Sequence, residues 1–347
     1  MITKKLALTA AAAVAVSVAF AGAANAQSRD QIRAVGSSTV FPFTTAVAEA
    51  FGKSGSFKTP VVESTGTGGG FRLFCAGVGP AHPDVSNASR RIKKSEVEQC
   101  AANGVAEITE LKIGFDGIVL ASSKAGQHMD LTRAQLWKAL AKDVPVDGKM
   151  VANPYKRWSD VDPSLPNVEI EVLGPPPTSG TRDAFNELAM EAGCHEVKEV
   201  AAIVTDAKAL AQACMAIRED GAYVEAGEND NLIVQKLVAN PSAFGVFGYS
   251  FLDQNKDKLQ AAEINDVPPT YENISSGKYP VSRSMFVYIK NAHVGVIPGI
   301  REFVAEYTSE RAMGEEGYLA DKGLIALPKA ERDGVRSSAV NMTPMKL

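Results

Sequence analysis

The sequence has few of the residues from which covalent catalysts and metal centres are built. Its 347 residues include four cysteines and four histidines, and neither type occurs at the spacing of zinc ligands. No G-x-S-x-G elbow is present, and the histidines lie in segments that do not suggest a shared site: His82, His128, His195 and His293. Clustered Asp and His, which metal-dependent phosphatases require, are also missing. We therefore expect no metal and no enzymatic activity.

Long apolar runs and an excess of positive charge are missing from most of the chain. After residue 26 no run of 18 apolar residues occurs, so we expect no membrane span there. The formal net charge is −4, and −6 without Lys4 and Lys5, with both signs interspersed, which disfavours nucleic acid as a partner. Residues 1–26 have a basic start, a short apolar stretch and the ending Ala24-Asn25-Ala26, which is typical of a cleavable secretory signal peptide.

The rest of the chain, residues 27–347, is long for a single hydrophobic core and predicts two domains. An even number of cysteines in an exported chain predicts two disulfide bonds, for which three connectivities exist. We favour Cys75 with Cys100 and Cys194 with Cys214, because each pair closes a short loop. The alternative is four buried thiols.

Strands alternate with helices along the chain, which predicts an α/β fold with largely parallel sheets. Three strand-to-helix turns are rich in glycine and small hydroxyl residues: 36–42, 65–70 and 177–183. Ligands of such folds bind where the carboxyl ends of the strands meet the helices. The first turn of a helix offers unpaired N–H groups and partial positive charge, so these turns favour an anion.

The turn at 177–183 carries the most donors. Thr178, Ser179 and Thr181 offer hydroxyls, Gly180 allows close approach of the backbone, and Arg182 adds a planar cation. The alternative is that such hydroxyls only cap helices. Two of the three turns lie in the first half of the chain and the third in the second half. We therefore predict a cleft between two domains that closes on a small anion.

A fourth strand-to-helix turn, at 83–91, places Ser89 and Arg90 at the start of an expected helix at 94–102. These two residues are further candidate donors. For Arg90 and its neighbour Arg91 the alternative is a solvated surface pair, and for the glycine-rich turn at 65–70 it is a flexible loop.

Five features, in order, resemble the periplasmic phosphate-binding proteins of Pst-type ABC transporters. They are the signal peptide and the segments Gly36-Ser37-Ser38-Thr39-Val40-Phe41-Pro42, Thr67-Gly68-Gly69-Gly70, Asp84-Val85-Ser86-Asn87-Ala88-Ser89-Arg90 and Thr178-Ser179-Gly180-Thr181. The resemblance implies a hinged two-domain α/β protein, a type II periplasmic binding protein, with residues 27–112 and 285–347 in domain I and 113–284 in domain II. It also implies a monomer without a cofactor that captures inorganic phosphate in the periplasm and delivers it to an inner-membrane permease.

The resemblance also assigns phosphate-binding residues. Combined with the turns above, it gives this set: Ser38, Thr39, Val40, Thr67, Gly68, Ser89, Arg90, Ser179, Gly180, Thr181 and Arg182. Two positions depart from the family. Arg90 stands where a carboxylate is expected, and Pro175 stands where an arginine is expected, so we expect Arg90 and Arg182 to act as the cationic donors.

The missing carboxylate bears on the choice of ligand. A buried acceptor facing a phosphate O–H selects phosphate over sulfate, because sulfate has no proton to donate at neutral pH. Asp116, Asp183 or Glu225 are the candidates to replace it. Alternative functions are a binder of sulfate or arsenate, a phosphate sensor subunit and, least favoured, an exported phosphoester hydrolase with Ser179 or Thr67 as nucleophile.

Overall fold

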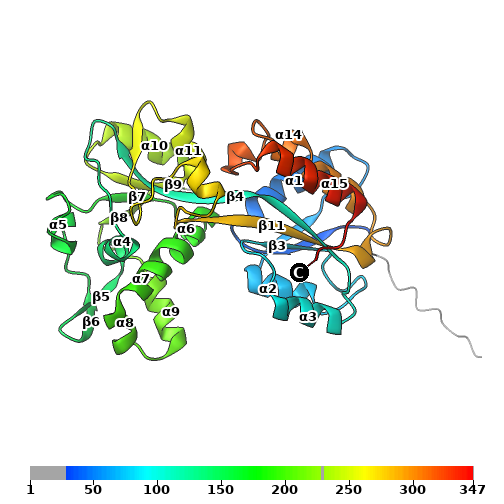
Figure 1. The fold of residues 1–347 in the computed structure, drawn as a ribbon, viewed down its shortest axis with the longest axis horizontal. Coiled ribbons are helices and arrows are strands. Elements are labelled where there is room, and N and C mark those ends of the chain that lie inside the picture. The colour runs from blue at the N-terminus through cyan, green and yellow to red at the C-terminus, as the bar shows by residue number, and fades with distance from the viewer. Residues whose placement is uncertain (1–28, 228–229, 347) are drawn as a thin grey trace, which may run out of the picture.

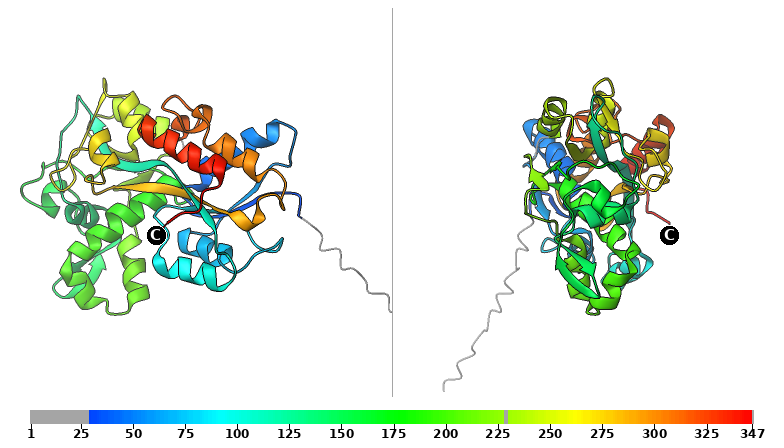
Figure 2. Two further views of the ribbon diagram at one scale, coloured as in Figure 1. Left: turned by 45° about the vertical axis from the view of Figure 1, so that its right-hand side comes forward. Right: turned by 90° about the vertical axis from the view of Figure 1, so that its left-hand side faces the viewer.

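The computed structural model describes residues 29–227 and 230–346, so the predicted signal peptide lies outside the described residues. The chain forms two lobes that lie side by side (Figure 1). Two strands cross from one lobe to the other, β4 (Ile108–Ser123) and β11 (Ser282–Lys290). The left view of Figure 2 shows the same orange strand, β11, between the lobes.

The described strands form a nine-stranded sheet in the order β2-β1-β3-β11-β4-β9-β7-β8, with β10 paired to β4. The remaining members are β1 (Arg33–Gly36), β2 (Val61–Ser64), β3 (Val85–Ala88), β7 (Val172–Gly174), β8 (Tyr223–Glu225), β9 (Phe244–Gly248) and β10 (Leu259–Ala261). A separate hairpin consists of β5 (Asp143–Val146) and β6 (Lys149–Ala152). The predicted α/β fold is confirmed.

The parallel pairs lie toward the two ends of the sheet. β1 is parallel to β2 and β3, and β7 is parallel to β8 and β9. The centre is antiparallel, because β4 and β11 run in opposite directions between the lobes. The 16-residue strand β4 pairs with β11 up to Gly117 and with β9 from Ile118 onward, so a single strand serves both lobes.

Helices cover the sheet in both lobes. The first lobe holds β1 to β3 together with α1 (Phe41–Lys53), α2 (Thr67–Phe74), α3 (Lys94–Ala102), α13 (Ile300–Tyr307), α14 (Glu310–Met313), α15 (Lys329–Asn341) and the short helices η2 (Asn291–His293) and η3 (Ala320–Lys322). The second lobe holds α4 (Arg133–Leu140), α5 (Trp158–Val161), α6 (Gly180–Phe185), α7 (Ala192–Glu196), α8 (Lys198–Ile203), α9 (Ala207–Met215), α10 (Asp230–Ala239), α11 (Tyr249–Gln254), α12 (Tyr271–Ser275) and the π-helix η1 (Asn186–Glu191).

Local sequence explains the helix that matters most for the site. In α1, Phe43, Val47 and Phe51 recur every four residues and are buried together on one face. Pro42 lies in the first turn, where its missing N–H costs no hydrogen bond. This apolar face packs against α13, and the packing fixes the direction in which the N-terminus of α1 points.

Two disulfide bonds connect the helices, and both predicted pairs are confirmed. Cys75 at the end of α2 bonds to Cys100 in α3, and Cys194 in α7 bonds to Cys214 in α9. No free cysteine occurs among residues 29–227 and 230–346. In the same described part of the chain no helix has the length and apolar character to cross a membrane, and no group of three or more Asp, Glu, His or Cys side chains is arranged to hold a metal ion.

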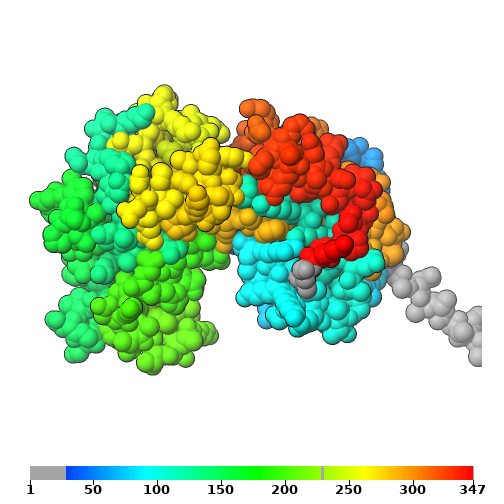
Figure 3. Space-filling model, in the orientation of Figure 1, coloured from blue at the N-terminus to red at the C-terminus, as the bar shows by residue number. Residues whose placement is uncertain are grey.

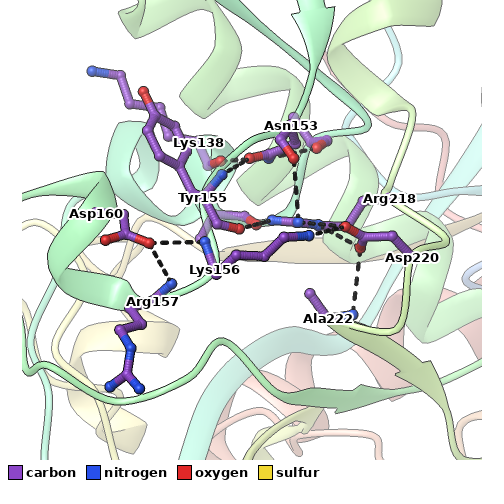
Figure 4. A network of polar contacts seen from close by, with 11 residues as sticks. Lys138, Asn153, Tyr155, Lys156, Arg157, Asp160, Arg218, Asp220 and Ala222 are labelled. Carbon is purple, nitrogen blue, oxygen red and sulfur yellow. Dashed lines mark hydrogen bonds and ion pairs between the residues drawn. The ribbon is translucent and has the colours of Figure 1, made fainter.

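A buried arginine fastens the β5–β6 hairpin to the second lobe (Figure 4). Arg218 is only 2% exposed, and its guanidinium donates hydrogen bonds to the Asp220 carboxylate at 2.8 and 2.6 Å. It also donates to the carbonyl oxygens of Ala139 (3.0 Å) and Tyr155 (2.9 Å). Ala139 precedes the hairpin in the sequence and Tyr155 follows it. The Arg218 side chain therefore anchors the chain on both sides of the hairpin.

Candidate functional site

A cleft with a volume of about 650 Å³ contains residues from both lobes. Figure 3 shows the lobes as separate bodies with a groove between them. The cleft is lined by the start of α1, the start of α6, the middle of β4 and parts of α10, β9, α11 and η3. The lining residues are Ser38, Thr39, Phe41, Pro42, Phe43, Ser64, Asp116, Thr178, Ser179, Gly180, Thr181, Asp230, Asn231, Gly248, Phe251, Asp321, Lys322 and Gly323.

Two helix N-termini face this cleft, one from each lobe. In the described structure no side-chain hydrogen bond caps α1, which begins at Phe41. At α6 the Ser179 hydroxyl oxygen accepts a hydrogen bond from the Thr181 N–H at 3.2 Å, so Ser179 is a helix cap. Its hydroxyl proton is still able to donate. Both ends bring N–H groups and partial positive charge to the cleft.

Glycine at position 180 allows the lobes to touch. A Cβ atom at Gly180 would lie 3.0 Å from the Ser38 carbonyl oxygen and 3.2 Å from the Thr39 Cα. Both atoms belong to the backbone of the first lobe and have little freedom to move. The structure therefore brings the first and third predicted turns into direct contact, as the sequence predicts for a cleft between two halves of the chain.

An arginine that the sequence analysis did not select reaches into the same region. Arg283 of β11 lies directly opposite Asp116 of β4 in the antiparallel ladder. Its guanidinium donates to the Thr39 hydroxyl oxygen at 2.6 Å and to the carboxylate of Glu187 in η1, and its Nε lies 3.6 Å from Asp116 Oδ2. Arg283 thus contacts residues of both lobes. The sequence did contain a hint of this pair: Asp116 and Arg283 are charged residues, one acidic and one basic, that each lie within a largely apolar strand segment.

Two buried carboxylates line the cleft, those of Asp116 and Asp230. Asp116 is 9% exposed, and its Oδ2 atom has no hydrogen-bond partner among the described residues. Asp230, the first residue of α10, is 5% exposed; its Oδ2 accepts from the Gly248 N–H at 3.1 Å, whereas its Oδ1 has no partner in that part of the chain.

Burial raises the pKa of both carboxyl groups. The pKa of Asp230 is raised to about 6, and the nearby negative charge of Asp116 adds to this rise. The positive charge of Arg283 opposes the rise of the Asp116 pKa.

Of the three acceptors considered from the sequence, Asp116 lines the cleft, Asp183 lies in α6, and Glu225 is exposed at the end of β8. The sequence analysis did not select Asp230.

The structure brings Ser38, Thr39, Ser179, Gly180 and Thr181 together at the cleft. Val40 is buried as the N-cap residue of α1, next to Thr39. Thr67 and Ser89 bond to each other instead, with 3.0 Å between their hydroxyl oxygens, and the Ser89 N–H donates to the Thr67 hydroxyl oxygen at 3.1 Å. Gly68 lies beside Thr67 in α2. For Thr67, Gly68 and Ser89 a role in binding stays a prediction.

Both predicted arginines have protein partners. Arg90 forms two hydrogen bonds with the Glu96 carboxylate, at 2.9 and 2.7 Å, and its guanidinium lies over the Phe71 ring. Arg182 is buried, donates to the Pro175 carbonyl oxygen at 3.1 Å, and stacks on the Tyr223 ring at 4.5 Å. Arg182 therefore supports the loop that leads to Ser179, and contact of either arginine with a ligand stays a prediction.

Comparison with known proteins agrees with this geometry. A family model described as the PBP superfamily domain matches residues 21–311. The chain is 35% identical to the protein SphX of Synechococcus elongatus over 307 residues (86% of this chain, 78% of SphX), and 31% identical to the phosphate-binding protein PstS of Staphylococcus saprophyticus over 319 residues (89% and 85%). A crystal structure described as a possible phosphate binding protein from Planctomyces limnophilus superposes with a TM-score of 0.71 at 29% identity, covering 90% of this chain and 98% of that one. The chain therefore belongs to the PBP superfamily and, within it, to the family that contains SphX and the phosphate-binding protein PstS.

Proposed function

We propose that this protein captures inorganic phosphate in the cleft between its lobes and delivers it to the permease of an ABC transporter. The observation that carries the proposal is the meeting of two helix N-termini, with the hydroxyls of Thr39, Ser179 and Thr181, around one cleft that also holds a buried carboxylate. Relatives across most of the chain that are named phosphate-binding proteins support it. A ligand with both acceptor oxygens and O–H donors matches these groups.

Asp116 is the best-supported replacement for the carboxylate expected at position 90. It lines the cleft, it is buried, and its Oδ2 atom has no hydrogen-bond partner among the described residues. Arg283 Nε lies 3.6 Å from this oxygen, too far for a hydrogen bond, so the oxygen is still able to accept one from a ligand. Hydrogen phosphate supplies such a donor whereas sulfate does not. Arg283 holds the Asp116 charge in place and supplies the buried cation that Pro175 cannot.

The two strands that cross between the lobes are the proposed hinge. The predicted domain boundaries, between residues 112 and 113 and between 284 and 285, fall within β4 and β11. Bending of two adjacent strands lets the lobes separate and close while the helices of each lobe stay packed on its own part of the sheet. The signal-peptide pattern and the two disulfide bonds support export to an oxidising compartment, which we infer to be the periplasm. We further propose a monomer that acts without catalysis.

Calorimetric titration tests the function. The mature chain, residues 27–347, is stripped of bound anion and titrated with phosphate, arsenate and sulfate. We expect tight binding of phosphate, binding of arsenate because it carries the same protons, and little binding of sulfate. Comparable binding of phosphate and sulfate, or of sulfate alone, would show that the cargo is a different anion.

Two variants test the acceptor. Asp116→Asn keeps the shape of the side chain but can donate to an unprotonated oxygen, so at about pH 6.5, where most of the free phosphate carries two protons, it should weaken phosphate binding and strengthen sulfate binding. Asp183→Asn is the matched control, since Asp183 lies in α6 outside the set of lining residues described above. Unchanged discrimination in Asp116→Asn would remove Asp116 from the recognition of phosphate.

A further inference from the structure

The cleft contains two buried carboxylates, each with an oxygen that accepts no hydrogen bond from the described residues, although recognition of one phosphate proton requires only one acceptor. Asp116 Oδ2 and Asp230 Oδ1 are both buried and lack a hydrogen-bond partner among the described residues. They come from different elements, β4 and α10, and both line the cleft. The Arg283 cation lies 3.6 Å from Asp116 Oδ2 but forms no hydrogen bond with it. Two buried oxygens in one cavity that accept no hydrogen bond suit a ligand that brings two donors.

The charged residues around Asp116 and Asp230 also favour a ligand that carries two protons. Arg283 of β11 faces Asp116, and Glu187 of η1 binds this arginine from the other side. The Gly248 N–H at the end of β9 faces Asp230, and Asp321 and Lys322 of η3 line the same cleft. Arg182 and Glu225 both lie near Tyr223, on whose pKa Asp230 also acts. Counted together, the carboxylates of Asp116, Asp230, Glu187, Glu225 and Asp321 outnumber the cations of Arg182, Arg283 and Lys322, so each additional negative charge on a ligand is penalised.

We propose that Asp116 and Asp230 each accept a hydrogen bond from a protonated oxygen of the ligand, so that this protein selects the dihydrogen phosphate anion, H2PO4−, over HPO4²⁻. The inference rests on the proposed function. Dihydrogen phosphate has two O–H groups and two unprotonated oxygens. The first two match the two carboxylates, and the other two match the N-termini of α1 and α6 with their adjacent hydroxyls.

The proposal has a defined pH dependence. Above the second pKa of phosphate the free anion carries one proton, so forming the complex takes up one proton from solution, and the affinity falls about tenfold per pH unit. At low pH the affinity falls again as the acceptors become protonated, because burial raises the pKa of both carboxyl groups, to about 6 for Asp230. The greatest affinity therefore lies between the protonation of these two carboxylates and the second pKa of phosphate.

Calorimetry at pH 6.5, 7.5 and 8.5, in two buffers with different ionisation enthalpies, counts the protons taken up. For the wild-type chain we expect uptake of about one proton per phosphate at pH 8.5 and an affinity that falls toward tenfold per pH unit. In Asp230→Asn the amide can donate to an unprotonated oxygen. Uptake should therefore disappear, and binding at pH 8.5 should be stronger than in the wild type. Glu199→Gln, which removes an exposed carboxylate of α8 outside the set of cleft-lining residues, is the control and should keep the wild-type proton uptake.

The outcomes separate the two proposals. Phosphate binding with no proton uptake at pH 8.5, and an affinity that is constant or rises with pH, would overturn the selection of dihydrogen phosphate and leave the proposed function standing. Failure to bind phosphate at any of the three pH values would overturn the proposed function itself. If Asp230→Asn does not fold, as judged by circular dichroism, the wild-type proton count decides alone.

Discussion

The contact between the lobes at Gly180 predicts that adding one methyl group there will impair ligand binding without harming the fold. The new Cβ of Gly180→Ala would lie 3.0 Å from the Ser38 carbonyl oxygen, whereas ordinary contact begins near 3.4 Å. Since both Ser38 and Thr39 present backbone atoms, the strain is most easily relieved by separating the lobes by about 0.4 Å. The backbone at position 180 is helical and accepts alanine.

The size of the effect follows from the hydrogen bonds that depend on closure. Hydrogen bonds to a charged ligand contribute about 1.5–3 kcal/mol each, so losing one of them weakens phosphate binding roughly 10-fold to 100-fold. The free protein should not lose stability, because the lobes separate to relieve the contact. Alanine in the first turn of a helix should instead raise the free energy of unfolding by up to about 1 kcal/mol.

Titration calorimetry and thermal unfolding of the anion-free protein measure the two effects. Gly334→Ala in α15 is the matched control: this glycine is also helical, but a Cβ atom there meets no atom within 4 Å. We expect it to raise stability slightly and to leave phosphate affinity unchanged. Wild-type affinity in Gly180→Ala would refute the reasoning, because it would mean that the contact between Gly180 and Ser38 is not needed for binding.

Three further predictions concern stability. Arg218→Met should lower the free energy of unfolding, measured in urea, by about 2–3 kcal/mol, because the buried Ala139 carbonyl oxygen loses its donor, while Asp220, whose side chain is 40% exposed, remains accessible to water. Lys156→Met should change it by less than about 0.5 kcal/mol, since the Lys156 side chain is 69% exposed; equal effects would contradict the buried network. Hydrogen bonds from Arg218 hold the pKa of Asp220 well below its ordinary 3.8, so the stabilisation is present above that pH and is lost as the pH falls through the lower folded value. The stability difference between wild type and Asp220→Asn should therefore shrink from pH 5 to pH 2, and a constant difference would argue against this assignment. Replacing both Cys194 and Cys214 by serine should cost about 3 kcal/mol because the bond closes a loop of 20 residues, and an unchanged thermal midpoint would mean that this bond does not stabilise the fold.

Local sequence predicted the parts of the site that depend on local geometry. Hydroxyl residues and glycine at a strand-to-helix turn determine how that turn folds, so the segments at Ser38 and Ser179 could be identified separately. Their meeting at one cleft followed from the rule that such turns share an edge of the sheet. The disulfide pairs were predictable for a similar reason, since each joins neighbouring helices through a short loop.

The electrostatics of the site could not be predicted in this way, because they depend on contacts between distant segments. Arg283 meets Asp116 only through the register of β11 on β4, which no local pattern determines. For Arg90 the competing partner is local. Glu96, in the first turn of α3, accepts a hydrogen bond from the Lys93 N–H and also binds the Arg90 guanidinium, which would otherwise be available to a ligand. Arg182 is held by Tyr223, which lies 41 positions further along the chain.

The position of β11 at the centre of the sheet has a consequence for the order in which the chain can fold. β11 pairs with β3 and with β4, yet its residues, 282–290, are among the last to be synthesised. Until they arrive, the sheet of the first lobe ends at β3, and β4 lacks its partner on that side. The N-terminal third of the chain can form helices and local turns, but it cannot complete its hydrophobic core. A chain built in this order stays incompletely folded while it is being made, which is the condition that a polypeptide must meet to be threaded across a membrane.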